Sequence, residues 1–141
     1  MKRTVVRVSL ALVIGFAVGV IGTQVFSAEE ELAKGKILQR VEVAGVKGKE
    51  VVLVLRELPA AKESGKHTQS GTEVAYVLDG SMTLEVQGKP PVSLKAGDSF
   101  QTGPRQVHNV KNNSAAAPAK VLVFYITENG KGLADISKPV K

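Results

Sequence analysis

The chain contains two histidines, His67 and His108, and each lies beside other potential metal ligands. In an extended segment His67 and Gln69 point to the same face, because side chains alternate along a strand. Glu73 follows four residues after Gln69, whereas His108 lies in another predicted strand. Two imidazoles, a carboxylate and an amide oxygen could surround one divalent cation if the fold brings them together. A lone histidine in a β protein is more often a surface or hydrogen-bonded residue, so the spacing has to support ligation.

The composition excludes several classes of site. The 141 residues are enough for one domain, and 43% hydrophobic with 23% charged residues is globular composition. Without cysteine there is no disulfide, zinc-thiolate site, iron–sulfur cluster or thiol nucleophile. Lys2, Arg3 and Arg7 supply three of the 19 basic residues, so 16 remain against 13 acidic ones, and these are interspersed. A nucleic-acid partner is therefore not predicted.

The first 28 residues have the layout of an export signal. A basic start is followed by Val8 to Ala28, which carry no charge and are mostly apolar. This run is also long enough for an uncleaved anchor, since about 20 apolar residues cross a bilayer core. We expect either a signal peptide or a membrane anchor over residues 1–28, with a tether through residues 8–28 in the second case. Both predict an exported domain, periplasmic or otherwise extracytoplasmic.

The rest of the chain predicts an all-β domain. Short runs typical of strands are separated by turn-forming residues, with Pro59 ending the second run. Asp79-Gly80, between two apolar runs, is typical of a hairpin turn. The predicted strands cover residues 37–43, 50–58, 73–78, 82–87, 92–94, 99–102, 107–111 and 120–127. We expect a loose linker over residues 29–35, a single β-barrel over 36–128, and a flexible tail over 129–141.

Residues 61–112 resemble the two motifs of the cupin superfamily. The first motif is G-x5-H-x-H-x3,4-E-x6-G, and the chain matches it with His67, Glu73 and Gly80. The second motif is G-x5-P-x-G-x2-H-x3-N, and the matching residues are Gly97, His108 and Asn112. The departures are Ala61, Gln69, Gly103 and Arg105, which stand in the positions of a glycine, the second histidine, the proline and a glycine.

The resemblance implies a small single-domain cupin with a jelly-roll β-barrel, and the apolar run within residues 1–28 is expected to form a helix that precedes it. Family members usually bind a divalent metal, and residue by residue the ligands here would be His67, Gln69, Glu73 and His108. An amide oxygen is a weaker donor than an imidazole to iron, manganese, nickel or zinc, so we expect lower affinity and faster exchange. If Gln69 does not ligate, two histidines and a carboxylate remain, which is the ligand set of many non-haem iron oxygenases. A site that has lost its metal is the alternative.

Three functions from different classes follow from this resemblance. The first is a metal-dependent enzyme acting on a small organic molecule, with dioxygenase, decarboxylase, isomerase and lyase chemistry all found among cupins. The second is a non-catalytic protein that binds or senses a metal or small ligand. The third is a structural module that forms a homodimer. Tyr76 and Tyr125 are candidate acid–base groups, with packing as their alternative role; the reaction and the identity of the metal are not predicted.

Overall fold

The computed structural model of the chain describes residues 35–140, which form ten strands and one short helix. The elements in chain order are β1 (Lys36–Glu42), β2 (Lys49–Leu58), β3 (His67–Gln69), β4 (Thr72–Asp79), β5 (Ser81–Val86), β6 (Val92–Lys95), β7 (Ser99–Thr102), β8 (His108–Asn112), β9 (Ala119–Glu128), α2 (Leu133–Ile136) and β10 (Ser137–Pro139).

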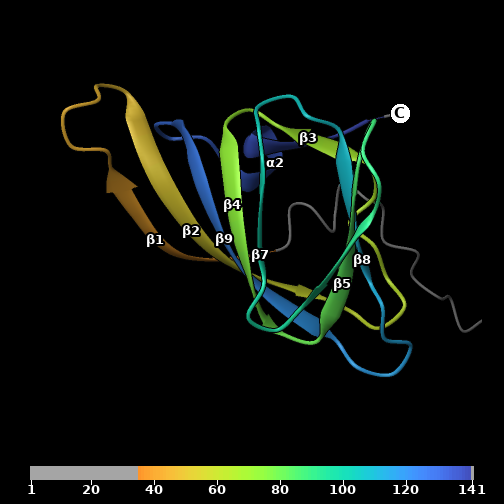
Figure 1. Cartoon of the computed structure of the whole chain (residues 1–141). Coiled ribbons are helices and arrows are strands. Elements are labelled where there is room, and N and C mark those ends of the chain that lie inside the picture. Colours follow the sequence, from red (N-terminus) through yellow and green to blue (C-terminus); the bar gives the residue numbers. More distant parts are fainter. Residues whose placement is uncertain (1–34, 141) are drawn as a thin grey trace, which may run out of the picture.

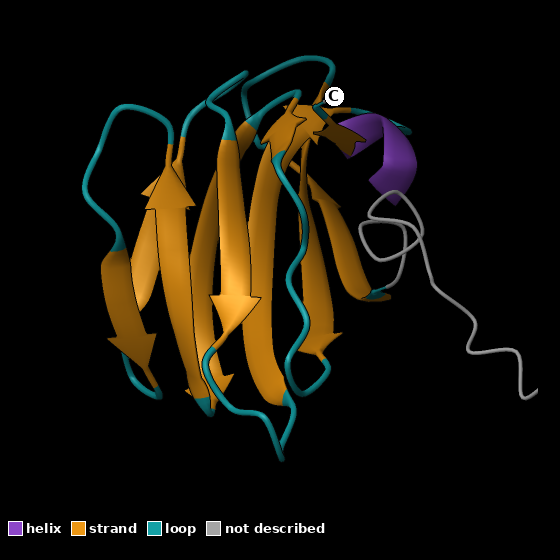
Figure 2. Cartoon of the chain, turned by 90° about the vertical axis from the view of Figure 1, so that its right-hand side faces the viewer, coloured by secondary structure: helices purple, strands orange, loops and turns teal. Residues whose placement is uncertain are grey.

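Two antiparallel sheets face each other across one core (Figures 1 and 2). The strand order is β1-β2-β9-β4-β7 in the first sheet, called sheet I below, and β10-β3-β8-β5-β6 in the second, sheet II. The predicted all-β class is confirmed, and the two sheets are consistent with a cupin jelly roll. Some predictions concern residues before 36 and lie outside the described residues. These are the apolar helix, the signal peptide or anchor, and most of the linker. Within residues 35–140 no helix combines the length and the apolar character that a membrane span requires.

The core lies between the sheets because apolar side chains alternate along the two longest strands. On β2 the even-numbered residues Val52 and Val54 are fully buried, and on β9 the odd-numbered Val123 and Tyr125 are almost as deeply buried. β2 and β9 are paired along ten residues of each strand, so these side chains form one continuous inner face. Strands with this period-two pattern put every second side chain toward the core.

The turn at Asp79-Gly80 connects the two sheets and does not close a hairpin, which corrects the sequence-based expectation. Asp79 still pairs with Lys120 in sheet I, whereas Ser81 pairs with Lys95 in sheet II. Gly80 has φ +81°, and a Cβ on it would lie 2.9 Å from the Ala119 Cβ. The same turn-forming residues therefore serve a sharp corner, because an Asp-Gly pair specifies a reversal and not the partner strand.

The segment from residue 129, expected to be a flexible tail, contains α2 and β10. Leu133 and Ile136, one helical turn apart, are buried in the core. Strand β10 then pairs with β3, where Ser137 lies opposite Gln69 and Pro139 opposite His67. This short apolar pair carries too weak a periodic signal to predict a helix, yet it anchors the end of the chain against the strand that carries His67.

Asn112, the last residue of the second motif, ties three chain segments together. Its side-chain nitrogen donates to the carbonyl oxygens of Leu58, Pro59 and Ala117 at 2.9–3.0 Å, and its oxygen accepts the Ser114 N–H at 2.9 Å. The residue is 8% exposed, so water cannot replace these partners.

Replacing Asn112 by alanine should lower the free energy of unfolding by about 2–4 kcal/mol, because buried carbonyls lose their donor. Chemical denaturation followed by circular dichroism measures this change. Asn113→Ala is the matched control, since Asn113 is exposed and its side chain accepts one bond from Thr83; it should shift stability by no more than about 0.5 kcal/mol. Equal effects of the two substitutions would contradict the structural role of Asn112.

Candidate metal centre

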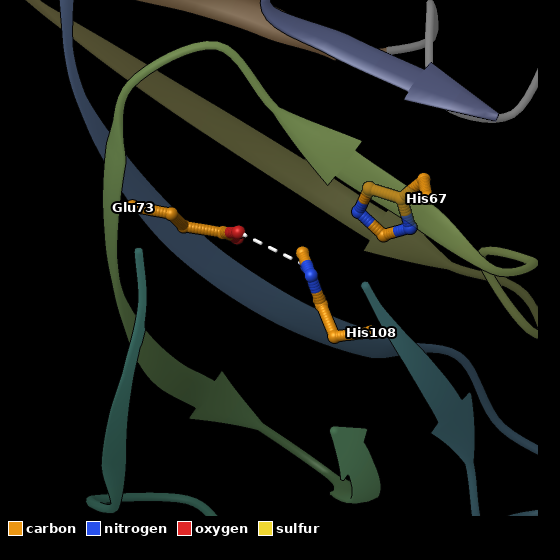
Figure 3. A group of neighbouring side chains, drawn as sticks. All are labelled: His67, Glu73 and His108. Atoms are coloured by element: carbon orange, nitrogen blue, oxygen red, sulfur yellow. Dashed lines mark ion pairs between the residues drawn. The ribbon is translucent and has the colours of Figure 1, made fainter. Parts of the chain in front are cut away.

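The four residues predicted as ligands come together at one place between the sheets. Strand β3 presents His67 and Gln69, and β8 of the same sheet presents His108. Strand β4 presents Glu73 from the opposite sheet, and Figure 3 shows His67, His108 and Glu73 together. His67 and His108 are direct cross-strand partners, with ring centroids 4.1 Å apart. One ligand atom from each histidine and one from Glu73 all lie within 4.8 Å of one another. All four residues are buried, with exposed fractions of 5% or less.

Backbone carbonyls orient both imidazole rings. His67 Nδ1 is 2.8 Å from the Gly65 oxygen, and His108 Nδ1 is 3.0 Å from the Gln106 oxygen. A carbonyl only accepts, so we assign the proton to Nδ1 in each ring. In the neutral rings this leaves the Nε2 lone pair for the interior of the site. Histidines that bind metals usually have their second nitrogen fixed in this way.

Glu73 is an ionised carboxylate in a buried position. Burial alone would raise its pKa, but its hydrogen bond with His108, the electrostatic interactions with both imidazoles and a hydrogen bond from Thr102 hold that pKa below the ordinary value. The Glu73 Oε2 atom lies 3.2 Å from His108 Nε2 and 3.0 Å from the Thr102 hydroxyl. Thr102, at the end of β7, was not predicted from the sequence, because a single hydroxyl before a turn carries no distinguishing signal.

Gln69 lies between the carboxylate and one of the imidazoles. Its amide nitrogen donates to Glu73 Oε2 and is 2.9 Å from His108 Nε2, while its amide oxygen is 3.3 Å from the Thr102 hydroxyl. With His108 protonated on Nδ1, both amide hydrogens have an acceptor. The amide therefore takes up the space between two of the three candidate ligands and satisfies both of them by hydrogen bonds.

Burial keeps His67 neutral at pH values well below its ordinary pKa. Desolvation, followed by the charge of His108, lowers that pKa from 6.5 to about 4, against the opposing effects of the Gly65 hydrogen bond and Glu73. An unfolded chain takes up a proton at this histidine near pH 6.5, whereas the folded protein does so only near pH 4. The neutral imidazole is also the form that binds metals.

From this difference we expect the stability of metal-free protein to be complete above pH 6.5 and to fall as the pH drops toward 4. His67 contributes about 3 kcal/mol to that loss. Urea unfolding between about pH 7 and pH 4 tests the slope, and His67→Gln should flatten it. Proton NMR of the two histidine rings gives the titration directly; a His67 midpoint near 6.5 would contradict the prediction.

A cavity of about 60 Å³ opens beside the cluster within the barrel. His67 and Glu73 line it, together with Arg56 and Tyr125, while most of the remaining wall is apolar, with Leu58, Met82, Phe100, Val110, Val121 and Val123. A candidate metal centre with a small adjoining cavity can bind and orient a small molecule next to a cation. Tyr76, the other tyrosine considered from the sequence, is 45% exposed on the outer face of sheet I and does not belong to this site.

The cupin domain model matches residues 54–125, which is half of the chain and includes all four predicted ligands. The chain belongs to the cupin family. A search of curated proteins finds no match. This cupin is similar in fold to several solved structures, including a cupin-like protein from Thermotoga maritima with 18% identity and a TM-score of 0.52, over 72% of this chain and 73% of the other.

Two further structures share the fold. One is a Klebsiella pneumoniae protein with a double-stranded β-helix domain, with 18% identity and a TM-score of 0.53 over 84% of this chain and 98% of that one. The other is the DMSP lyase DddQ from Ruegeria pomeroyi, with 16% identity and a TM-score of 0.54 over 76% of this cupin. The matched region is only 52% of the lyase chain.

The two glycine positions of the cupin motifs that this chain fills with other residues keep a glycine-like backbone. Ala61 has φ +57° and Arg105 has φ +60°, and they are the only described non-glycine residues with positive φ. The Arg105 N–H donates to the Gln69 carbonyl at 2.8 Å, so this strained turn holds the strand that carries two candidate ligands. A side chain in this conformation costs about 1–2 kcal/mol.

Replacing Ala61 by glycine should therefore raise the free energy of unfolding by about 0.5–1 kcal/mol, because relief of this strain exceeds the entropy that glycine gains on unfolding. Ala44→Gly serves as the control, since Ala44 is an exposed turn residue without positive φ and should lose stability. Urea denaturation of both variants measures the difference. A loss of stability in Ala61→Gly would contradict the inference that the Ala61 backbone is strained.

Proposed function

We propose that this cupin binds one divalent metal ion through His67, Glu73 and His108 and binds or converts a small organic molecule in the adjoining cavity. The observation that carries the proposal is the convergence of two oriented imidazoles on one buried carboxylate. His108 Nε2 and Glu73 Oε2 lie 3.2 Å apart, which brings one nitrogen ligand and one oxygen ligand to the same place. Two nitrogens and one oxygen suit iron, manganese, nickel or zinc.

Gln69 determines how this site would accept a cation. Its amide nitrogen occupies the space between Glu73 and His108, so the amide has to turn before a cation can contact both ligands. Rotation by half a turn about the bond that carries the Gln69 amide group exchanges the positions of its oxygen and nitrogen. The amide oxygen then points toward the cluster. Thr102 is compatible with the turned amide, because its hydroxyl can donate its one hydrogen to Glu73 and accept a hydrogen from the turned amide. A site with such an amide is expected to bind a metal ion more weakly, and to release it faster, than a site with four fixed ligands.

A cation held by His67, Glu73 and His108 would supply Lewis-acid or redox chemistry next to a bound substrate. The chain itself supplies an ionised carboxylate at Glu73, the buried phenol of Tyr125, and apolar walls that exclude water. The structural similarity to a DMSP lyase is compatible with lyase chemistry, but at 16% identity it supports the fold alone. Dioxygenase, isomerase, decarboxylase and lyase reactions therefore remain the proposed range of an enzymatic function.

A non-catalytic binding or sensing protein is the second candidate, and Gln69 favours it. With its amide donating to both Glu73 and His108, the cluster is hydrogen-bonded without any cation. Such a network lowers the affinity for metal, which suits reversible occupancy or a site that no longer holds a metal. We also propose that the protein is exported, on the basis of the basic start and the apolar run of residues 8–28.

The metal content of protein recovered from its native compartment, purified without chelators, tests the proposal. We expect close to one divalent ion per chain, removed by a chelator and restored on addition of metal. Consumption of dioxygen over a panel of phenols, thiols and keto acids then separates an oxygenase from a binding protein. Substoichiometric metal that His67→Ala does not change would reject the proposed site.

A further inference from the structure

Thr102, the last residue of β7, is the direct cross-strand partner of Glu73 in sheet I. Its exposed fraction is 1%, so its hydroxyl has to find partners within the protein. The hydroxyl oxygen is 3.0 Å from Glu73 Oε2 and 3.3 Å from the Gln69 amide oxygen. Because a β-branched side chain has few rotamers, the hydroxyl has a defined place between a candidate ligand and the Gln69 amide.

The turn that follows Thr102 is tied to the same cluster. The Gln106 carbonyl oxygen is 3.0 Å from His108 Nδ1, and the Arg105 N–H donates to the Gln69 carbonyl at 2.8 Å. The segment between Thr102 and His108 is therefore bonded both to a candidate ligand and to the backbone of Gln69. These bonds fix the Thr102 hydroxyl relative to the cluster.

The Thr102 hydroxyl has one hydrogen and two oxygens that compete for it. The Gln69 amide nitrogen donates to Glu73 and is 2.9 Å from His108 Nε2, so the amide oxygen faces Thr102. Glu73 Oε2 is the nearer acceptor of the same hydrogen. Since a hydroxyl donates one hydrogen, one of these two buried oxygens has only a shared donor, and a buried acceptor without its own donor is costly.

Rotation of the Gln69 amide by half a turn removes this competition. The amide nitrogen then faces the Thr102 oxygen and donates to it, while the Thr102 hydrogen goes to Glu73 alone. The amide oxygen takes approximately the place of the nitrogen, which is 2.9 Å from His108 Nε2 and next to Glu73 Oε2. Neighbouring ligands of one cation at about 2.1 Å are separated by about 3.0–3.4 Å. The turned oxygen is therefore close to ligand spacing from a nitrogen and from an oxygen, which Figure 3 shows pointing toward each other.

We propose that Thr102 is a positioning residue for the metal centre, which lowers the cost of turning the Gln69 amide and holds the amide oxygen as a fourth ligand. This inference rests on the proposed function and specifies its donor set, which would be two imidazole nitrogens, one carboxylate oxygen and one neutral amide oxygen. Thr102 occupies an unspecified position of the second cupin motif, between Gly97 and Gly103.

Zinc affinity of Thr102 variants, measured by calorimetric titration, tests the role of the hydroxyl. Thr102→Val keeps the shape of the side chain and should weaken zinc binding about tenfold, because the turned amide loses its acceptor and Glu73 loses a donor. Thr102→Ser keeps the hydroxyl and should stay within about threefold of the native affinity. Thr83→Val is the matched control, since the Thr83 hydroxyl donates to Asn113 at 2.7 Å on the outer face of sheet II. This control should leave zinc binding unchanged.

The Gln69→Ala background shows whether Thr102 acts through the amide. Gln69→Ala alone should weaken zinc binding because it removes a ligand, whereas removal of an amide that only obstructs the site would strengthen binding. Thr102→Val should then weaken zinc by no more than about threefold in the Gln69→Ala protein, since only the contact with Glu73 remains. A threonine with a merely structural role would lower the stability of the metal-free protein to urea and change zinc affinity equally in both backgrounds.

NMR of isotope-labelled protein reports the orientation of the amide independently of affinity. The side-chain amide signals of Gln69 are identified by their loss in Gln69→Ala. In metal-free protein we expect nuclear Overhauser contacts from these amide hydrogens to the His108 ring, in agreement with the distance of 2.9 Å. In zinc-loaded protein we expect contacts to the Thr102 side chain instead. Contacts to His108 that persist in zinc-loaded protein overturn the proposal.

The experiments separate two failures. If the native protein does not bind zinc, the proposed function is overturned and this inference with it. If zinc binds but Thr102→Val binds it as tightly as the native protein, or Gln69→Ala binds it more tightly, only the role of Thr102 and Gln69 is overturned. If Thr102→Val does not fold, the affinity of Gln69→Ala and the amide contacts in the zinc-loaded native protein decide the result.

Discussion

Gln69→His should bind divalent metal about ten- to a hundredfold more tightly than the native protein, because an imidazole nitrogen replaces an amide. The position is suitable, since the Gln69 amide nitrogen is 2.9 Å from His108 Nε2 and donates to Glu73. The substitution also removes the amide that has to turn before a cation can enter. Calorimetric titration with zinc and nickel measures both affinities.

Thr68→His is the matched control for this variant. It adds a histidine to the same strand, but Thr68 faces away from Gln69, as the alternation of burial along β3 shows. The affinity for metal should therefore stay at the native value. Equal or weaker binding by Gln69→His, or equal gains in both variants, would show that Gln69 does not lie at the metal.

His108→Ala should abolish measurable metal binding while the protein remains folded. The substitution removes one of the three ligands, which should lower affinity by at least about a hundredfold. It also leaves the Gln106 carbonyl and one Gln69 N–H without their partner, at a cost of about 2–4 kcal/mol of stability. Metal analysis and circular dichroism of the same sample separate the two effects.

The control for this variant is Lys111→Ala, a partly exposed position on the same strand β8. It should keep both the metal and the fold, apart from the small contribution of its ion pair with Glu85. If the native protein never contains metal and His108→Ala unfolds, then His108 is a packing residue and not a ligand. Retention of metal by His108→Ala would place the ion elsewhere.

The candidate ligands could be predicted from the sequence, because strand geometry and motif spacing together indicate which residues they are. His67 and Gln69 share a face through the period of two, and Glu73 and His108 occupy the positions that the cupin motifs give to ligands. Their convergence depends on two sheets closing over one core, which a sequence of short apolar runs with frequent turns already indicates.

The parts that were missed depend on which strands become neighbours. Asp79-Gly80 predicts a reversal, but the pairing of Ser81 with Lys95 instead of with β4 is decided by packing of the whole barrel. The helix α2 is four residues long and is held by burial of Leu133 and Ile136, not by helix propensity. Arg56 reads in sequence as one more polar residue ending an apolar strand, and only its phase with Val52 and Val54 places it inside.

Crystals of zinc-loaded protein, measured on both sides of the zinc absorption edge, test the central claim most directly. We expect one anomalous peak inside the barrel, about 2.0–2.2 Å from His67 Nε2, His108 Nε2 and a Glu73 oxygen, with the Gln69 amide turned away from its present hydrogen bonds. The absence of a peak there, with the Gln69 nitrogen still donating to Glu73 and His108, would contradict the account and leave a hydrogen-bonded cluster without a metal.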